Sequence, residues 1–134
     1  MRPLARHSAS WAAAFLAVAV FPVAAAGQDH GWDCQRISNL PQIGINACLA
    51  DEWRAADEDL NEVYRRLMAE LSPADSETLR QAQRAWIPFR DAACDVEAGQ
   101  MRGGSGEPML RYSCLARLTE RRVEDMTHLT VLYE

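Results

Sequence analysis

The chain has 134 residues and a formal net charge of -5, and all 14 of its permanently positive side chains are arginines. An acidic chain without a basic stripe suits a cationic protein partner better than nucleic acid or an anionic lipid surface. Its length allows a single small domain, and its apolar runs are far shorter than the roughly 20 residues that a transmembrane helix needs. The composition therefore argues against a nucleic-acid-binding or membrane-spanning protein.

Residues 1–26 have the pattern of a secretory signal peptide. Two arginines precede the apolar residues 11–20, and a run of small residues ends at Ala26. We expect cleavage near Ala26, which would leave a mature domain of residues 27–134 with a net charge of -7, since both arginines are lost. The first cysteine, Cys34, lies beyond this point, so we expect a periplasmic or secreted protein and not a lipoprotein.

Three helices are predicted from the spacing of apolar residues and from signals at the helix ends. Apolar or large side chains recur at three- and four-residue steps, and no window shows the alternation of a half-buried strand. Ser72 or Ser76 can cap a helix, Pro73 suits a first helical turn, and the stretch GQMRGGSGEP suits a break. We predict an all-α fold, a small disulfide-stapled bundle built on an antiparallel helix hairpin plus a third helix. The predicted helices cover residues 41–71, about 75–98 and 108 to about 132.

Several polar residues fall on the stripes that the first two helices should turn toward each other. In an antiparallel hairpin one register brings all of them opposite complementary partners, as an ion pair and as amides that face an indole N–H and a phenol hydroxyl. We interpret them as a network that fixes the helix register. The predicted pairs are Asp57 with Arg90, Asn61 with Trp86, and Tyr64 with Gln83.

These residues also carry a family resemblance. The stretches ADEDLNEVYRRLMAEL and LRQAQRAWIPFRDAAC, followed by GGS and then by YSCLARLTERR, resemble the LprI N-terminal domain family of lysozyme-inhibitor-like proteins. The resemblance covers about residues 34–129. It implies an exported helical domain with disulfides, and a lysozyme-inhibiting role.

Four cysteines in a short exported chain predict two structural disulfides. Four cysteines allow three pairings, and we favour the sequential one, because each bridge would then staple an irregular segment to the helix beside it. The main rival joins the second cysteine to the third, which lie at the same end of a helix hairpin. The favoured bridges are Cys34 with Cys48 and Cys94 with Cys114.

The segment between the last two cysteines is the predicted partner-binding site. Gly103, Gly104 and Ser105 could present backbone groups and a hydroxyl, and a disulfide at the base of the loop would hold them ready. Glu97 and Glu107 flank the loop, and we include Glu107 in the candidate site. The alternative is a tether whose glycines satisfy turn geometry and whose glutamates are ordinary solvated charges.

No metal, cofactor or catalytic group is predicted. His30 and His128 are isolated in the sequence, and no base stands next to Ser105 that would make it a nucleophile. The first hypothesis is therefore an exported inhibitor, not an enzyme, that binds a cationic muramidase, with a c-type lysozyme as the candidate partner and no oligomeric state assigned. The alternatives are a periplasmic protein-interaction or envelope-stress module without lysozyme inhibition, and an uncharacterised enzyme.

Overall fold

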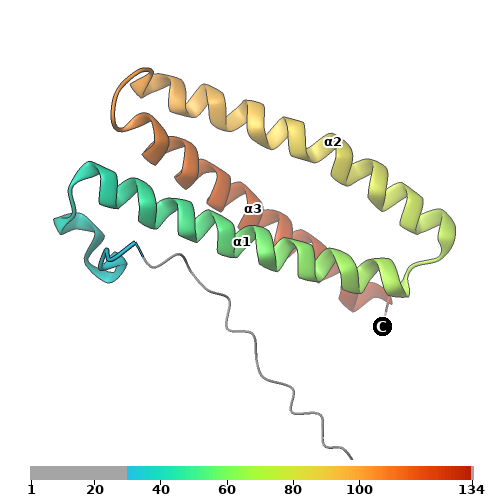
Figure 1. The fold of residues 1–134 in the computed structure, drawn as a ribbon. Coiled ribbons are helices and arrows are strands. Elements are labelled where there is room, and N and C mark those ends of the chain that lie inside the picture. The colour runs from blue at the N-terminus through green and yellow to red at the C-terminus, as the bar shows by residue number, and fades with distance from the viewer. Residues whose placement is uncertain (1–29, 134) are drawn as a thin grey trace, which may run out of the picture.

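The computed structural model of the protein describes residues 30–133, which form an all-α fold without strands (Figure 1). A 3-10 helix, η1 (Cys34–Asn39), precedes three long helices, α1 (Gln42–Glu70), α2 (Pro73–Ala98) and α3 (Glu107–Tyr133). A short 3-10 helix, η2 (Gly99–Met101), follows α2. The predicted fold class is confirmed, whereas the predicted signal peptide lies outside the described residues. Within that part of the chain, no helix has the length and apolar character of a membrane span.

The ends of the helices follow local chemistry. The Ser72 hydroxyl accepts a hydrogen bond from the Asp75 backbone N–H at 3.2 Å, and Pro73 occupies the first turn, where no N–H is needed. α2 therefore begins two residues before the predicted position, because the cap is Ser72 and not a later residue. The helix continues through Pro88 to Ala98 without a break.

α3 lies between the other two helices and forms the centre of the packing (Figure 1). It packs extensively along α1 and over a smaller surface against α2, whereas α1 and α2 come close at very few points. α1 and α2 are antiparallel neighbours in the chain, as predicted (Figure 1). The hairpin is held together mainly through α3, and this arrangement decides which side chains meet.

The apolar core consists of two clusters along the bundle. One cluster joins all three helices near the α1–α2 turn, and the other surrounds a disulfide at the opposite end. The α1 stripe that enters the core is Ala56, Leu60, Val63 and Leu67, so Val63 belongs to it and the predicted Asn61 does not. The first cluster contains Leu60, Val63, Leu67, Leu79 and Met126; the second contains Cys94, Cys114 and Leu115.

Both disulfides have the sequential pairing. Cys34 is bonded to Cys48 across 14 residues, and Cys94 is bonded to Cys114 across 20 residues, each with a Cα–Cα distance of 5.5 Å. The rival pairing of Cys48 with Cys94 is therefore absent. In the chain-entropy description each bridge destabilises the unfolded chain by about 3 kcal/mol, which is a large contribution for a domain of this size.

Candidate functional site

The predicted loop is an exposed turn between η2 and α3. Residues 102–105 are exposed, and Gly106 is buried behind them. Gly103 has a φ of +76°, in the left-handed region where an L side chain is strained. Its backbone N–H donates a hydrogen bond of 2.6 Å to the Glu107 carboxylate at the start of α3. The first glycine of the pair is thus required by the turn, and the chain bends back on itself here.

The back of the loop is fastened to the first turns of α1. The Asn46 side-chain amide donates to the Ser105 carbonyl oxygen at 3.0 Å, and Gln42 donates to the Asn46 side-chain oxygen at 2.9 Å. A Cβ atom at Gly106 would lie 2.5 Å from the Met101 sulfur, so a larger residue here would have to displace the Met101 side chain. The Ser105 hydroxyl makes no hydrogen bond within the described chain, and Ser105 is exposed. The backbone on the inner side of the loop, its back, is thus held by Asn46 and Glu107, while the exposed side of residues 102–105, its front, makes no such contact.

Each of the two flanking glutamates accepts a hydrogen bond. Glu107 holds the Gly103 N–H, in the first turn of α3 where the helix dipole favours a carboxylate. Glu97 accepts a hydrogen bond of 2.7 Å from Arg117 and so ties α2 to α3 below the loop. Each glutamate thus has one partner, a backbone N–H for Glu107 and an arginine for Glu97, and both side chains remain partly exposed.

The base of the loop is covalently closed and packed with aromatic side chains. The Cys94–Cys114 disulfide is buried, and Trp53 stacks on Tyr112 with 5.9 Å between ring centroids. The indole N–H of Trp53 is buried, with no hydrogen-bond partner in the described chain. These contacts join α1, α2 and α3 directly under the loop, so the loop stands on the most cross-linked part of the fold.

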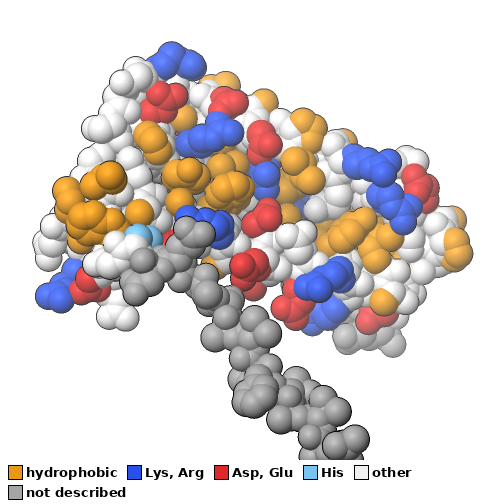
Figure 2. All heavy atoms as spheres, in the orientation of Figure 1, with side chains coloured by type: hydrophobic (Ala, Val, Ile, Leu, Met, Phe, Trp, Pro, Cys, Tyr) orange, Lys and Arg blue, Asp and Glu red, His pale blue; other side chains and the backbone are white. Residues whose placement is uncertain are grey.

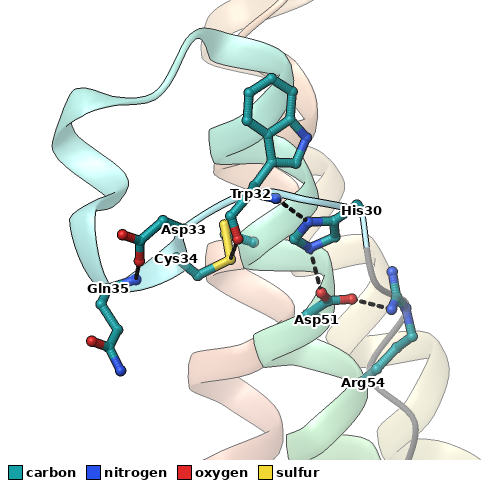
Figure 3. Close-up of a disulfide and its surroundings, with 8 residues drawn as sticks. His30, Trp32, Asp33, Cys34, Gln35, Asp51 and Arg54 are labelled. Atoms are coloured by element: carbon teal, nitrogen blue, oxygen red, sulfur yellow. Dashed lines mark hydrogen bonds and ion pairs between the residues drawn. A yellow bond between two sulfur atoms is a disulfide. The ribbon is translucent and has the colours of Figure 1, made fainter.

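The N-terminal segment before η1 is fastened to the same end of α1 (Figure 3). His30 Nε2 lies 2.6 Å from the Asp51 carboxylate, and His30 Nδ1 accepts the Trp32 backbone N–H at 3.2 Å. Arg54 pairs with the other oxygen of Asp51. Trp32 also covers Gly44, where a Cβ atom would lie 3.0 Å from the indole ring.

In the sequence His30 stands alone, but in the structure it has a partner. Its partner Asp51 lies 21 residues away on α1. The sequence does not show that this face of α1 turns toward His30. His30 also lies near Cys34 and Cys48, and these three groups have the proximity of a metal site. Because the two sulfur atoms are bonded to each other, they are not available as thiolate ligands.

The predicted polar network exists with different pairs. Arg90 is only 7% exposed and donates to Asp57 at 3.3 Å, so the predicted contact between these two is present. Asn61 donates to Asp57 and does not accept the Trp86 indole N–H, and it is exposed. Gln83 accepts from Arg122 at 2.8 Å and does not bond the Tyr64 hydroxyl.

The pairs differ because α1 and α2 come close at few points: Tyr64 and Gln83 line the same cavity from the two helices without a hydrogen bond, and α3 supplies donors and acceptors instead. Arg90 also reaches Asp91 at 2.9 Å and the fully buried Thr119 hydroxyl at 3.5 Å. The guanidinium groups stack on aromatic faces, with Arg90 lying 5.2 Å from the Trp86 centroid and 5.9 Å from that of Trp53. Arg122 covers Trp86 from α3 at 5.8 Å. The network is thus a stack of cations and aromatic rings across three helices.

Two surface cavities open beside this stack. One, of about 320 Å³, opens between α1 and α2, and the other, of about 300 Å³, opens where the α1–α2 turn meets the end of α3. Near the first, Gln81 and Arg80 donate hydrogen bonds to Glu77 and lower its pKa. The first is lined by Asn61, Tyr64, Arg80, Gln83, Arg84 and Ile87; the second is lined mainly by Leu67, Leu71, Leu79, Ala82, Leu129 and Tyr133.

The acidity of the chain is spread over the surface. α1 exposes Glu52, Glu58, Asp59 and Glu62, and it also exposes arginines. Figure 2 shows acidic and basic side chains interspersed on the face that carries α1. The net negative charge therefore acts as a long-range field and not as one acidic patch.

The sequence is similar to known proteins along most of its length. It matches the family described as lysozyme inhibitor LprI over residues 34–126, which include both disulfides, the cation–aromatic stack and the loop. It is also similar to an uncharacterized protein of Rhizobium meliloti (strain 1021), with 37% identity over 110 residues, or 72% of this chain and 78% of the relative. No solved structure matches the chain. By its matching sequence, the chain belongs to the lysozyme inhibitor LprI family.

Proposed function

We propose that this protein is an exported inhibitor that binds a cationic muramidase through the loop of residues 102–105. The family description supports inhibition, and the candidate partner is a c-type lysozyme. Export is supported by the signal-like residues 1–26 and by two disulfides, which persist in oxidising compartments. The proposed role is binding, without a catalytic step.

The observation that carries the proposal is the combination of a fixed back and a free front in the loop. Asn46, Glu107 and the Cys94–Cys114 disulfide hold the backbone, while residues 102–105 remain exposed. A loop that is already ordered loses little entropy on binding, so more of its contact energy becomes affinity. Glycines and a serine also make a narrow segment, which suits a cleft that admits a polysaccharide.

Electrostatics support the same partner. Because such lysozymes are cationic, the acidic body of this protein would speed their encounter. Their cleft also contains the paired carboxylates that perform catalysis. Arg102 is exposed beside the glycine pair, and it has no ion-pair partner among the described residues. Its guanidinium is the loop group that could face those carboxylates directly.

The test is inhibition by the purified, disulfide-bonded protein. We expect lysis of cell walls by c-type lysozymes to slow at near-stoichiometric concentrations of the protein, and complex formation to appear in size-exclusion chromatography against a panel of lysozymes. Because the body is acidic, the association rate should fall as salt is added. A protein with both disulfides intact that neither binds nor inhibits any member of the panel would contradict the proposal and favour a periplasmic interaction module.

A second prediction concerns Arg102. We expect Arg102→Ala to weaken inhibition by roughly 10-fold or more, because a charge-assisted contact to a carboxylate is lost. The matched control is Arg121→Ala, which removes another exposed arginine without an ion-pair partner in the described chain, far along α3. Inhibition constants measured for both variants decide the matter, and equal effects would mean that only net charge counts.

A further inference from the structure

The two disulfides differ in their access to solvent. Cys34 is exposed and is bonded to the buried Cys48, whereas Cys94 and Cys114 are 0% and 1% exposed. A disulfide is reduced by a thiolate that attacks one of its sulfur atoms, so the reaction needs access to that atom. A dithiol reductant can therefore approach the first bridge at Cys34, while the protein interior protects the second bridge.

Reduction of the first bridge would leave two thiols beside a histidine. A ring nitrogen of His30 and the sulfur atoms of Cys34 and Cys48 all lie within 4.8 Å of one another, and Figure 3 shows His30 beside this disulfide. Zinc is bound in proteins by cysteine sulfur at about 2.3 Å and histidine nitrogen at about 2.0 Å, so tetrahedral donor atoms lie roughly 3.3 to 3.8 Å apart. Once the bond between the sulfur atoms is broken, small movements of three side chains would reach this spacing.

The hydrogen bonds of His30 leave one ring nitrogen suited to a metal ion. Nδ1 accepts the Trp32 backbone N–H at 3.2 Å, so this nitrogen has a lone pair and no proton. Nε2, which carries the proton, lies 2.6 Å from the Asp51 carboxylate. Zinc-binding histidines almost always donate their second ring N–H in this way, which fixes the ring and raises its basicity. Arg54 pairs with the other oxygen of Asp51, so the carboxylate is itself held in place.

We propose that the reduced N-terminal segment binds a zinc ion through His30, Cys34 and Cys48, with water in the fourth position. A dithiol attacks the Cys34 sulfur and displaces Cys48, and its second sulfur then displaces Cys34. The dithiol becomes a disulfide, and its two electrons and two protons convert the cysteines to thiols. Zinc binds both sulfur atoms as thiolates, so the two protons pass to solvent when the ion binds.

The zinc ion would replace the disulfide as the link between η1 and α1. Cys34 is the first residue of η1, and Cys48 lies in α1 two residues after Asn46, which holds the loop of residues 102–105. An ion that binds the folded form stabilises it by mass action. The segment before α1 thus has a covalent link under oxidising conditions and a metal link under reducing conditions. The proposal does not rest on lysozyme binding.

The test compares zinc binding before and after mild reduction of the purified protein. Dithiothreitol is added until peptide mapping shows only the Cys34–Cys48 bridge open, and it is then removed without oxygen, because it binds zinc itself. We expect the reduced protein to bind one zinc ion with a dissociation constant below about 1 µM, and the oxidised protein to bind at least about 100-fold more weakly. Cobalt(II), used as a probe, should give thiolate charge-transfer absorption with the reduced protein alone.

Two variants identify the ligands. In the reduced protein His30→Ala should weaken zinc binding by roughly 10-fold or more, and Asp51→Asn should weaken it by about 10-fold through the loss of the carboxylate beside the ring. The matched control is His128→Ala, which removes an exposed histidine of α3 and should change the dissociation constant by less than about threefold. Circular dichroism of the oxidised variants checks their fold.

Three outcomes would overturn the zinc site. The first is a reduced protein that binds no zinc and gives no cobalt charge-transfer band. The second is zinc binding that His30→Ala and Asp51→Asn leave unchanged, since two thiols alone would then account for it. The third is a Cys94–Cys114 bridge that opens as readily as the exposed one, because no form with only the first bridge reduced would then exist.

Discussion

Replacing Arg90 by alanine is expected to lower the free energy of unfolding by about 3 kcal/mol. The loss has three sources. The Thr119 hydroxyl, which is fully buried, loses its donor. The aromatic rings of Trp53 and Trp86 lose the guanidinium between them. The removed side chain also leaves a cavity at the junction of three helices, where the surrounding structure relaxes only partly.

The two aspartates contribute less to this loss than a buried ion pair would. The side chains of Asp57 and Asp91 are 42% and 43% exposed, so water can solvate both when Arg90 is gone. We therefore expect Asp57→Ala alone to cost about 1 kcal/mol or less. Urea unfolding of Asp57→Ala, Arg90→Ala and the variant with both changes, with the disulfides intact, measures the coupling between Asp57 and Arg90.

A matched control for Arg90→Ala lies six residues earlier on the same helix. Arg84 is exposed and makes no ion pair in the described chain, so Arg84→Ala should change the free energy of unfolding by less than about 0.5 kcal/mol. If Arg90→Ala were as mild as this control, the stack of cations and aromatic rings would not be a determinant of stability. Its role would then have to be sought in folding kinetics or in binding.

Ser105→Trp is expected to raise the inhibition constant toward a sensitive lysozyme by about 100-fold or more. Only the Ser105 carbonyl is used internally, through Asn46, so the larger side chain leaves the loop's attachment intact and obstructs its front. The fold should be preserved, because the replaced side chain is exposed. Circular dichroism and the urea midpoint check this, and a cell-wall lysis assay gives the inhibition constant.

The control for this variant places the same bulky ring elsewhere on the surface. Thr127 is exposed on α3, about 30 Å along the helix from Glu107 at roughly 1.5 Å per residue. Thr127→Trp should inhibit like the wild type. If Ser105→Trp inhibited equally well, the muramidase would have to bind a helical face, and the loop proposal would be withdrawn while the family assignment stayed intact.

The sequence contained most of the secondary structure but only part of the tertiary contacts. The helices could be predicted within one or two residues, because apolar periodicity, Ser72 with Pro73, and the glycines after Ala98 are local signals. The disulfides could be predicted because each one closes a short irregular segment. Local signals do not say which helix lies between the other two. The sequence pattern therefore predicts direct contacts between α1 and α2, and it does not identify Thr119 and Arg122 of α3 as the partners of Arg90 and Gln83.

The candidate site shows the same division. The exposed glycine pair of the loop could be found from the sequence, since glycine and serine favour turns. Its attachment could not, because Asn46 and Ser105 are 59 residues apart and neither has a distinctive neighbourhood. The sequence pattern places Asn61 on the inward face of α1, whereas the structure buries Val63 and exposes Asn61. The helical period alone does not decide which of two neighbouring faces of a helix is buried.

The location of both disulfides at one end of the bundle divides the molecule into a cross-linked half and a half held by packing alone. The second half contains the α1–α2 turn, the end of α3 and a cavity of about 300 Å³, so it is the less tightly held. On heating, local unfolding should therefore begin at this end, which has no disulfide. The loop of residues 102–105 lies at the opposite end, beside the Cys94–Cys114 disulfide. Partial opening of the bundle would therefore leave the geometry of the loop unchanged.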